Sequence, residues 1–400
     1  GSQTPMARIS ADWGYEQFAP GGCTVIGSNR PLGEIGAAWI NGTYASALDL
    51  DDGNRMAMGH PGANVIPAAL AVAERSGASG AQFLTSLVAG YELAVRTSAA
   101  RVPWYKDKLY STGIWGVFGA TAAAGKLLGL DDAALQSALG TAGSHGPFPP
   151  GGLQANHAMV KEVIAWSGMT GVSSALLARR GFIGPADFFD YTDRWDTSAL
   201  VKGLGERYAI LDTYFKPHAV CRWAHPSVDA VFALKQEHGL SPEEIEAIQV
   251  DTFWEVTRLV NYAPSNTIAA QFSIPFALAL AMNYDRIGPQ EVSEENLKRP
   301  AVVDLAQKVQ VSVDDNFNRQ FPAKTMARVT VKARGTDYQA TVEYPRGNAE
   351  NPLSDEEISD KFRNLACERL GTGRCEKLRA AILDLPHASD VSTVTRLLAS

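Results

Sequence analysis

The segment ALDLDDGNRMAMGHPGA, residues 47–63, interrupts a series of apolar stretches with a dense group of polar side chains. Apolar residues at helical spacing lie on both sides of it, and three glycines divide it. Polar groups this dense beside core-forming helices are either solvated or brought together in a site. The way the neighbouring helices pack around this segment therefore determines what the protein can do.

Length and composition limit the class of protein. The chain has 400 residues, 46% of them hydrophobic, which is enough for a substantial core in two or three domains. Its formal net charge of -7 argues against nucleic acid as the main partner but is compatible with a local cationic pocket. The sequence contains no secretory signal and no apolar run that could span a bilayer, which predicts a cytoplasmic protein without a membrane partner. The four cysteines lack metal-type pairing and are expected to be reduced thiols; they are Cys23, Cys221, Cys367 and Cys375.

The first half of the chain is rich in Ala, Gly and Leu and predicts a bundle of helices. Apolar residues recur near helical spacing over residues 35–48, 65–74, 81–100, 114–128, 133–143 and 160–180. Before the last of these, SHGPFPPGG at residues 144–152 predicts a loop.

The pattern changes after about Pro217 to the two-residue alternation typical of half-buried strands. Such stretches lie at residues 248–252, 309–313, 327–332 and 338–344, the last two joined as a hairpin through Gly335. Helices over 226–238, 267–283 and 294–307 are expected to cover one face, and capping boxes begin at Ser241 and Ser354. The sequence thus predicts a mainly α protein with an α+β lid. Its parts are a helical domain (1–216), the lid (217–346) and C-terminal helices (347–400) that rejoin the helical domain.

The acidic residues of the opening segment allow three interpretations. Asp49, Asp51 and Asp52 could bind a divalent cation, because Mg²⁺ and Ca²⁺ prefer oxygen ligands. Their spacing does not match an EF-hand loop, so solvation or salt bridging at the surface is the simpler alternative. We favour the third, in which the carboxylates hold Arg55 and His60. Asp49 or Asp52 would orient the imidazole, so that His60 could act as an acid, as a base or as a hydrogen-bond donor to an anion.

Two further positions place a polar group beside apolar helices. Tyr110 precedes Ser111, Thr112 and Gly113 at a predicted helix start, where a hydroxyl beside free backbone donors could cradle a carboxylate. The alternative is an ordinary amphipathic tyrosine. Lys161 begins an otherwise apolar helix, so its ammonium group either extends to solvent or meets an anion.

The segment YFKPHAVCRWAHP, residues 214–226, lies at the expected junction between the domains. It brings Lys216, His218, Arg222 and His225 among aromatic residues, and small ligands usually bind between domains. Four potential cations in ten residues indicate an anionic substrate, most simply a polycarboxylate. A basic surface loop is the alternative, which the apolar neighbours disfavour. The sequence contains no P-loop, no GxSxG nucleophile motif and no zinc-type spacing.

Taken together, these motifs resemble the MmgE/PrpD family, which includes 2-methylcitrate dehydratase, cis-aconitate decarboxylase and iminodisuccinate epimerase. The resemblance extends over nearly the whole chain, through NGTYASALDLDD, GHPGANVIPAALAVAE, TGIWGVFGATAAAGKLLGLD, FKPHAVCRWAHPSVDA, AAQFSIPFALA and YPRGNAENPLSDEEISDKF. It implies a large helical domain, a smaller α+β lid, a homodimer and an active site between the domains that needs no cofactor or metal. It also implies that Asp49, His60, Lys161 and Lys216 belong to the active site, with residues 271–276 nearby. Members of the family usually carry leading helices before the point where this sequence begins.

The residue at position 110 leads to a specific expectation about the reaction. The dehydratase and decarboxylase branches usually carry histidine there, whereas Tyr110 is more similar to the epimerase branch. We therefore expect an epimerase or isomerase of a dicarboxylate, with Tyr110 on one face of the substrate and Lys216 or Lys161 on the other. The residues expected to bind the substrate are Arg55, Thr112, Arg222, His225 and Gln271.

Two other functions remain as alternatives. One is a dehydratase or decarboxylase of a citrate-like acid, in which His60 would protonate a leaving hydroxyl. The other is a non-catalytic binding protein on an inherited enzyme fold, which the presence of Lys161, Lys216 and His60 disfavours.

Overall fold

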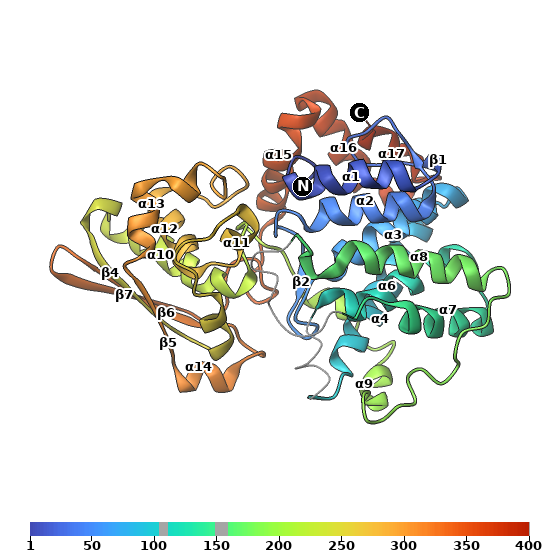
Figure 1. Cartoon of the computed structure of the whole chain (residues 1–400), viewed down its shortest axis with the longest axis horizontal. Helices are drawn as coiled ribbons and strands as arrows, with labels where there is room; N and C mark the ends of the chain where they lie inside the picture. The colour runs from blue at the N-terminus through green and yellow to red at the C-terminus, as the bar shows by residue number, and fades with distance from the viewer. Residues whose placement is uncertain (104–110, 149–158, 400) are drawn as a thin grey trace.

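Small residues let the helices of the first half pack closely. Gly90 in α4 (Gly80–Ala99) faces Gly119 in α6 (Thr112–Leu127), and a Cβ on Gly119 would lie 2.6 Å from the carbonyl oxygen of Gly90. The computed structural model describes residues 1–103, 111–148 and 159–399, and these form a large helical domain beside a smaller α+β domain (Figure 1). The other elements of the helical domain are α1 (Pro5–Gln17), β1 (Pro20–Cys23), α2 (Glu34–Ser46), α3 (Pro61–Ser76), α7 (Asp132–His145), α8 (Ile164–Ala178) and α9 (Thr197–Val201). The predicted fold class is confirmed.

The last helices of the chain pack on the helical domain. They are α15 (Asp355–Leu370), α16 (Thr372–Leu383) and α17 (Ser392–Leu398), and α15 begins at the predicted capping box of Ser354. Leu378 and Val394 share an apolar cluster with Val65 of α3 and Phe83 of α4. Both termini consequently lie on the same side of this domain (Figure 1).

The α+β domain is built on a four-stranded sheet. Its strands are β4 (Ile245–Thr252), β5 (Val309–Val313), β6 (Ala327–Ala333) and β7 (Thr336–Val342), in the order β5-β4-β6-β7. β4 runs parallel to β5 and antiparallel to β6, and β6 and β7 form the predicted hairpin through Gly335. The helices of this domain are α10 (His225–His238), α11 (Thr267–Gln271), α12 (Ile274–Asn283), α13 (Pro300–Ala306) and α14 (Asp315–Gln320).

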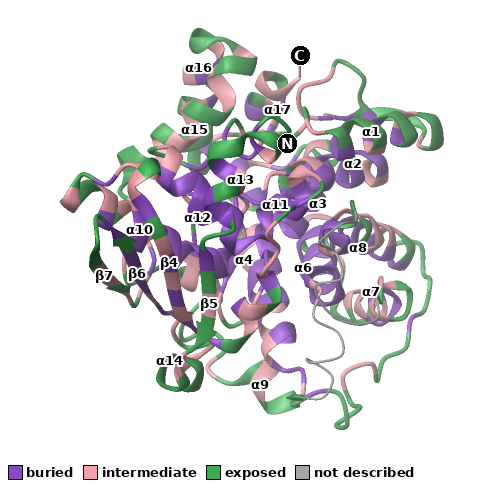
Figure 2. Ribbon diagram, turned by 60° about the vertical axis from the view of Figure 1, so that its left-hand side comes forward, coloured by how far each residue is buried: buried purple, intermediate pink, exposed green. Residues whose placement is uncertain are grey.

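The alternation predicted for these strands is confirmed by burial in β4 and β6, whereas in β5 it ends at Val313, which is 40% exposed. Ile248 and Val250 of β4 and Val329 and Val331 of β6 are buried in one cluster with residues of α10 and α12. None of the residues of β7 is buried, and Figure 2 shows the change from buried to exposed across the sheet. Helices thus cover one face, while the other face meets solvent.

Three predicted helices begin later or break, and proline and capping residues account for two of the differences. The predicted helix 267–283 is broken at Phe272, because Ser273 caps a new helix and Pro275 lacks the backbone N–H that a continuous helix needs. The predicted helix 294–307 begins as α13 only at Pro300, a favoured first residue. The third, 160–180, begins as α8 at Ile164, since the three residues before it have left-handed backbone.

The cysteines do not all remain thiols. Cys367 of α15 and Cys375 of α16 form a disulfide, so the expectation of four reduced thiols is wrong for this pair. Cys23 and Cys221 are free. Within the described ranges, no helix combines the length and the apolar character that crossing a bilayer requires.

Candidate active site

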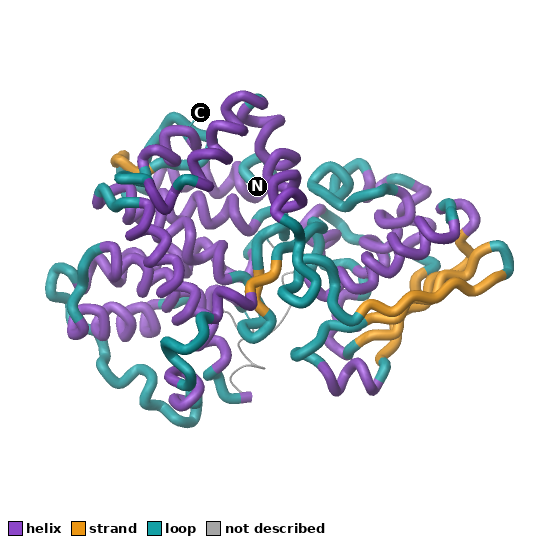
Figure 3. Tube along the Cα trace, turned by 180° about the vertical axis from the view of Figure 1, so that it is seen from behind, coloured by secondary structure: helices purple, strands orange, loops and turns teal. Residues whose placement is uncertain are grey.

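The acidic segment is held where the two domains meet. Residues of β2 (Gly53–Asn54) pair with β3 (Thr213–Tyr214), so the segment lies beside the chain that leads to Lys216 (Figure 3). A Cβ on Gly53 would lie 2.2 Å from the hydroxyl oxygen of Tyr214, and only glycine permits this approach. Near the end of the segment, His60 is the N-cap residue of α3.

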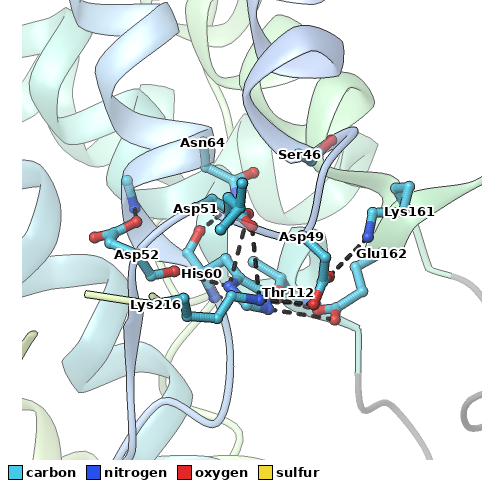
Figure 4. Close-up of polar contacts among 12 residues, drawn as sticks. Ser46, Asp49, Asp51, Asp52, His60, Asn64, Thr112, Lys161, Glu162 and Lys216 are labelled. Atoms are coloured by element: carbon cyan, nitrogen blue, oxygen red, sulfur yellow. Dashed lines mark hydrogen bonds and ion pairs between the residues drawn. The ribbon is translucent and has the colours of Figure 1, made fainter. Parts of the chain in front are cut away.

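Asp49 is the centre of a buried charged cluster. Its Oδ1 accepts a hydrogen bond from Lys161 Nζ and its Oδ2 one from Lys216 Nζ, both at 2.7 Å (Figure 4). Burial raises the pKa of Asp49, but Lys161, Lys216 and His60 outweigh it and hold that pKa below its usual range. Burial likewise lowers the pKa of Lys216, yet Asp49 and Asp51 together leave it above its usual value. Asp49 is therefore ionised and Lys216 protonated near neutral pH.

Lys161 lies beside Asp49 rather than extending to solvent. Its Nζ also donates to Gln271 Oε1 at 3.0 Å and lies 4.9 Å from the centre of the Phe272 ring. Gln271 in turn donates through Nε2 to the carbonyl oxygen of Ala47 at 3.1 Å. Gln271 thus ties Lys161 to the start of the acidic segment.

His60 is oriented by a backbone carbonyl and not by the side chain of Asp49 or Asp52, so that part of the sequence prediction is wrong. Its Nδ1 lies 2.7 Å from the carbonyl oxygen of Asp52, and since a carbonyl can only accept, Nδ1 carries a proton. Asp51 Oδ2 lies 3.6 Å from the same nitrogen. The other ring nitrogen, Nε2, lies 3.8 Å from Glu162 Oε1.

The carboxylate of Asp52 points away from His60. Its Oδ2 accepts a hydrogen bond from Tyr91 at 2.7 Å and its Oδ1 one from the Gly62 backbone at 3.0 Å. Burial, with a smaller contribution from Asp51, raises the pKa of Asp52 to about 6. Asp52 is therefore a structural group of the site with a titration close to neutral pH.

We expect Asp52→Asn to alter the pH dependence of stability. The pKa of Asp52 is about 6 in the folded protein, whereas an ordinary aspartate has a pKa of 3.8. Between these pH values the folded protein therefore binds a proton on Asp52 that the unfolded chain does not. Its contribution is favourable below pH 3.8 and is lost as pH rises through 6, by roughly 3 kcal/mol. Asparagine does not titrate and keeps an oxygen for Gly62.

Urea unfolding should show Asp52→Asn gaining stability relative to wild type from pH 4 to pH 7. An exposed control, Asp337→Asn, should show no such trend, and parallel pH curves for Asp52→Asn and wild type would contradict the assignment.

A pocket lies against this cluster and is lined from both domains. Its lining residues are Asp49, Asn54, Arg55, Met58, Gly59, His60, Glu162, Tyr214, Cys221, Arg222, Trp223, Phe272, Phe321, Pro322 and Thr325. Lys161 and Lys216 are not among its lining residues, and their ammonium groups are bonded to Asp49. The pocket is therefore less cationic than the sequence predicts, and its cations among the described residues are mainly arginines.

Arg222 is buried and fixed by the chain that follows the sheet. Its guanidinium donates to the carbonyl oxygens of Pro345 and Arg346 at 3.1 and 2.9 Å and to Asn348 Oδ1, and it lies over the Tyr214 ring. Burial lowers the pKa of Arg222 to about 10, so it stays charged at neutral pH. Its Nε has no partner among the described residues.

Arg55 is the second guanidinium of the pocket. Its Nη2 forms an ion pair with Glu350, while its Nη1 is buried without a partner among the described residues. Arg55 and Arg222 thus each keep a free N–H donor.

His225 and Thr112 are predicted substrate-binding residues that do not line the pocket. His225 Nδ1 accepts from Arg222 Nη1 at 3.1 Å, and its Nε2 donates to the carbonyl oxygen of Val220 at 3.1 Å. Burial, aided by Arg222, lowers the pKa of His225 well below its usual value, so the ring is neutral and supports the guanidinium. Thr112 is fully buried and its hydroxyl accepts from the His60 backbone at 3.3 Å. Tyr110 lies outside the described residues.

Glu162 is a pocket residue that no sequence motif indicated. It lies in a turn in which Lys161, Glu162 and Val163 all have positive φ, at 39°, 55° and 51°. This backbone is unfavourable for residues with a Cβ, and above all for a β-branched one, by roughly 1–3 kcal/mol each. The only signal in the sequence is its place beside Lys161 before an apolar helix. Strain of this kind persists where the surroundings impose it, often at functional sites.

Asp49, Asp51 and His60 also meet a geometric criterion for a metal site, with ligand atoms within 4.8 Å of one another. Both oxygens of Asp49 are already bonded to ammonium groups, however, and a divalent cation would add positive charge beside them. These side chains therefore fit a network of hydrogen bonds and ion pairs with protonated lysines better than they fit a metal ion.

The fold and the site define a two-domain enzyme whose pocket combines a fixed histidine with arginines and buried ion pairs. Comparison with known families is consistent with this. The MmgE/PrpD N-terminal domain matches residues 1–202 and the MmgE/PrpD C-terminal domain matches residues 218–386. The chain belongs to the MmgE/PrpD family, as the sequence motifs suggested.

Three similar proteins are named as a cis-aconitate decarboxylase or a protein like it. The chain is 27% identical to a cis-aconitate decarboxylase-like protein of Aspergillus oryzae, over all of this chain and 89% of the relative. It is also 27% identical to cis-aconitate decarboxylase of Aspergillus terreus, over all of this chain and 88% of that protein. With the human cis-aconitate decarboxylase the identity is 25%, over 90% of this chain and 79% of the relative.

Proposed function

We propose that this protein is a carboxy-lyase that removes CO₂ from a small tricarboxylic acid of the cis-aconitate type. The observation that carries the proposal is His60, whose Nδ1 is fixed by a carbonyl while Nε2 faces a pocket that holds two arginines. The names of the relatives support a decarboxylase more than the epimerase expected from Tyr110. The coarser expectation, an enzyme that acts next to a carboxylate, is common to both.

The two guanidinium groups would bind the carboxylates that remain on the substrate. Arg55 and Arg222 both line the pocket, and guanidinium groups form charge-assisted, often bidentate hydrogen bonds with carboxylates. His225 and the chain at 345–348 would keep Arg222 in place. Asn54, beside Arg55, adds a polar group to the same wall.

In the chemical step, the bond between the reacting carbon and its carboxyl group breaks, and CO₂ leaves without the electron pair. The pair moves into the bond toward the neighbouring C=C carbon, the double bond shifts, and the negative charge forms on the carbon that carries the other terminal carboxylate, where the arginines stabilise it. His60 Nε2 then donates its proton to that carbon, forming the C–H bond, and regains a proton from solvent. Lys161 and Lys216 would hold Asp49 in the pocket wall. Because the pKa of Lys216 is raised, it is a poor candidate for a proton-accepting group opposite Tyr110, where the sequence placed Lys216 or Lys161.

The direct test is incubation of the purified protein with cis-aconitate, following CO₂ release and the product by NMR. We expect release of one CO₂ per molecule of a product with one carboxyl group fewer. EDTA should leave the rate unchanged, since the proposed step uses side chains alone. Binding without turnover over a panel of di- and tricarboxylates would instead favour the non-catalytic alternative.

The epimerase remains a second candidate, favoured by one sequence observation, the tyrosine at position 110. An epimerase would exchange the α-proton of a dicarboxylate with D₂O without releasing CO₂. Deuterium incorporation into recovered dicarboxylate, with no CO₂ evolved, would therefore support the epimerase over the decarboxylase. The homodimer and the domain boundaries at 216 and 346 also stay predictions, and sedimentation would test the first.

A further inference from the structure

Glu162 is fixed in the pocket wall by the start of α6. Its Oε2 accepts hydrogen bonds from the Thr112 backbone at 3.1 Å and from the Thr112 hydroxyl. Its carbonyl oxygen accepts from the Ser111 hydroxyl at 2.6 Å. A Cβ on Gly113 would lie 3.0 Å from this carbonyl, so the glycine lets the turn approach the helix. The backbone donor predicted to cradle a substrate carboxylate is thus bonded to Glu162 instead.

The bonds around Thr112 run in one direction. The Thr112 hydroxyl gives its hydrogen to the Glu162 carboxylate, which can only accept, and so it must itself accept from the His60 backbone N–H. The second oxygen of Glu162 then lies 3.8 Å from Nε2 of the same histidine. His60 and Glu162 are therefore linked twice, once through Thr112 and once across the edge of the pocket (Figure 4).

The contacts of Nδ1, the other nitrogen of the imidazole, show that the proton in question is the one on Nε2. Nδ1 faces the Asp52 carbonyl oxygen, with Asp51 Oδ2 at 3.6 Å, so it keeps its proton. Asp49 adds negative charge nearby, but its two oxygens are taken by lysines. Glu162 is the carboxylate that faces Nε2 among the described residues, and a lone pair on Nε2 directed at it would be repelled.

We propose that Glu162 is a positioning residue that keeps a proton on Nε2 of His60, poised for transfer to the substrate carbon. The inference rests on the proposed function, in which His60 is the acid. Glu162 itself does not contact the reacting carbon. Its charge stabilises the imidazolium, and its bonds to Thr112 keep the carboxylate directed at Nε2 as the proton is used and regained.

The test is Glu162→Gln, which preserves size and the oxygen that accepts from Thr112. The amide can direct its NH₂ group at Nε2 and so favours an imidazole without a proton there. We expect kcat to fall about 10²-fold with KM within threefold of wild type. The alkaline fall in kcat/KM should move to lower pH, because the negative charge beside Nε2 is gone. The exposed control Glu294→Gln should retain wild-type kinetics.

A measurement on the resting protein separates this inference from the proposed function. In ¹⁵N-histidine-labelled protein near neutral pH, the His60 Nε2 signal should indicate a bound proton in wild type and a lone pair in Glu162→Gln. If the variant does not fold, Thr112→Val replaces it, and kcat should fall about tenfold because the carboxylate loses the Thr112 hydroxyl and keeps only the backbone N–H at this position.

The outcomes are distinct. Wild-type decarboxylation with an unchanged Nε2 signal and unchanged kcat in Glu162→Gln would overturn the role of Glu162 and leave the proposed function intact. If the wild-type protein acts on none of the acids, but the Nε2 signal still differs between wild type and Glu162→Gln, the proposed function is overturned. The coupling between His60 and Glu162 then still stands. A purely structural glutamate would lower stability without moving either the signal or the pH profile.

Discussion

Replacing Lys216 by methionine is expected to lower the free energy of unfolding by about 3–5 kcal/mol and to abolish turnover. Lys216 has no exposed surface, and its Nζ contacts Asp49 Oδ2 at 2.7 Å and Asp51 Oδ1 at 3.9 Å. Methionine fills similar volume but leaves both carboxylates in a buried site with one fewer positive charge. The measurement is urea unfolding at pH 7, together with the rate of CO₂ release.

Two further variants make this prediction specific. Asp49→Asn in the Lys216→Met background removes one uncompensated charge and should restore part of the lost stability, but not activity. Lys377→Met, at an exposed position of α16, should change stability by less than about 0.5 kcal/mol. If Lys216→Met were no less stable than Lys377→Met, the buried network would not be the organising feature of the site.

Replacing His60 by asparagine is expected to lower kcat by about 10²- to 10⁴-fold while the protein remains folded. The asparagine amide can still donate to the Asp52 carbonyl, and asparagine is a favourable residue at the N-cap of α3, where His60 stands. What it lacks is the nitrogen that faces the pocket. The loss should therefore appear in the rate and not in the stability.

The matched histidine control is His238→Asn. His238 ends α10, packs on Tyr338 and lies outside the pocket lining, so its replacement should leave turnover within twofold of wild type. Retention of full activity in His60→Asn would exclude His60 as the proton donor. Proton exchange in D₂O by the same variant would then direct attention to Tyr110.

Local patterns accounted for most of the fold. The alternation at Ile248, Val250 and Thr252 gave β4, and the capping boxes at Ser241 and Ser354 lie at the positions expected. These features depend on neighbours within a few residues, whose geometry the backbone periods impose. The order β5-β4-β6-β7 and the parallel pairing of β4 with β5 depend on contacts between distant segments, and no local pattern specified them.

The sequence predicted which residues lie close together in the site better than it predicted the contacts among them. Asp49, His60, Lys161 and Lys216 do lie together, but the sequence assigned the wrong partner to His60. It paired His60 with a carboxylate of the acidic segment, whereas the orienting group is a backbone carbonyl, which every residue carries. It assigned no role to Glu162, because the contacts that direct this side chain at Nε2 include Thr112, 50 residues away.

The sequence separations in the site imply a late step in biosynthesis. Lys161 and Lys216 bond to Asp49 across 112 and 167 residues, and Lys361 of α15 donates to the Leu50 carbonyl oxygen across 311 residues. A chain emerging from the ribosome can form its first helices early, but the acidic segment has all its partners only when nearly the whole polypeptide has been made. Until then its aspartates stay hydrated, so incomplete chains are expected to be inactive.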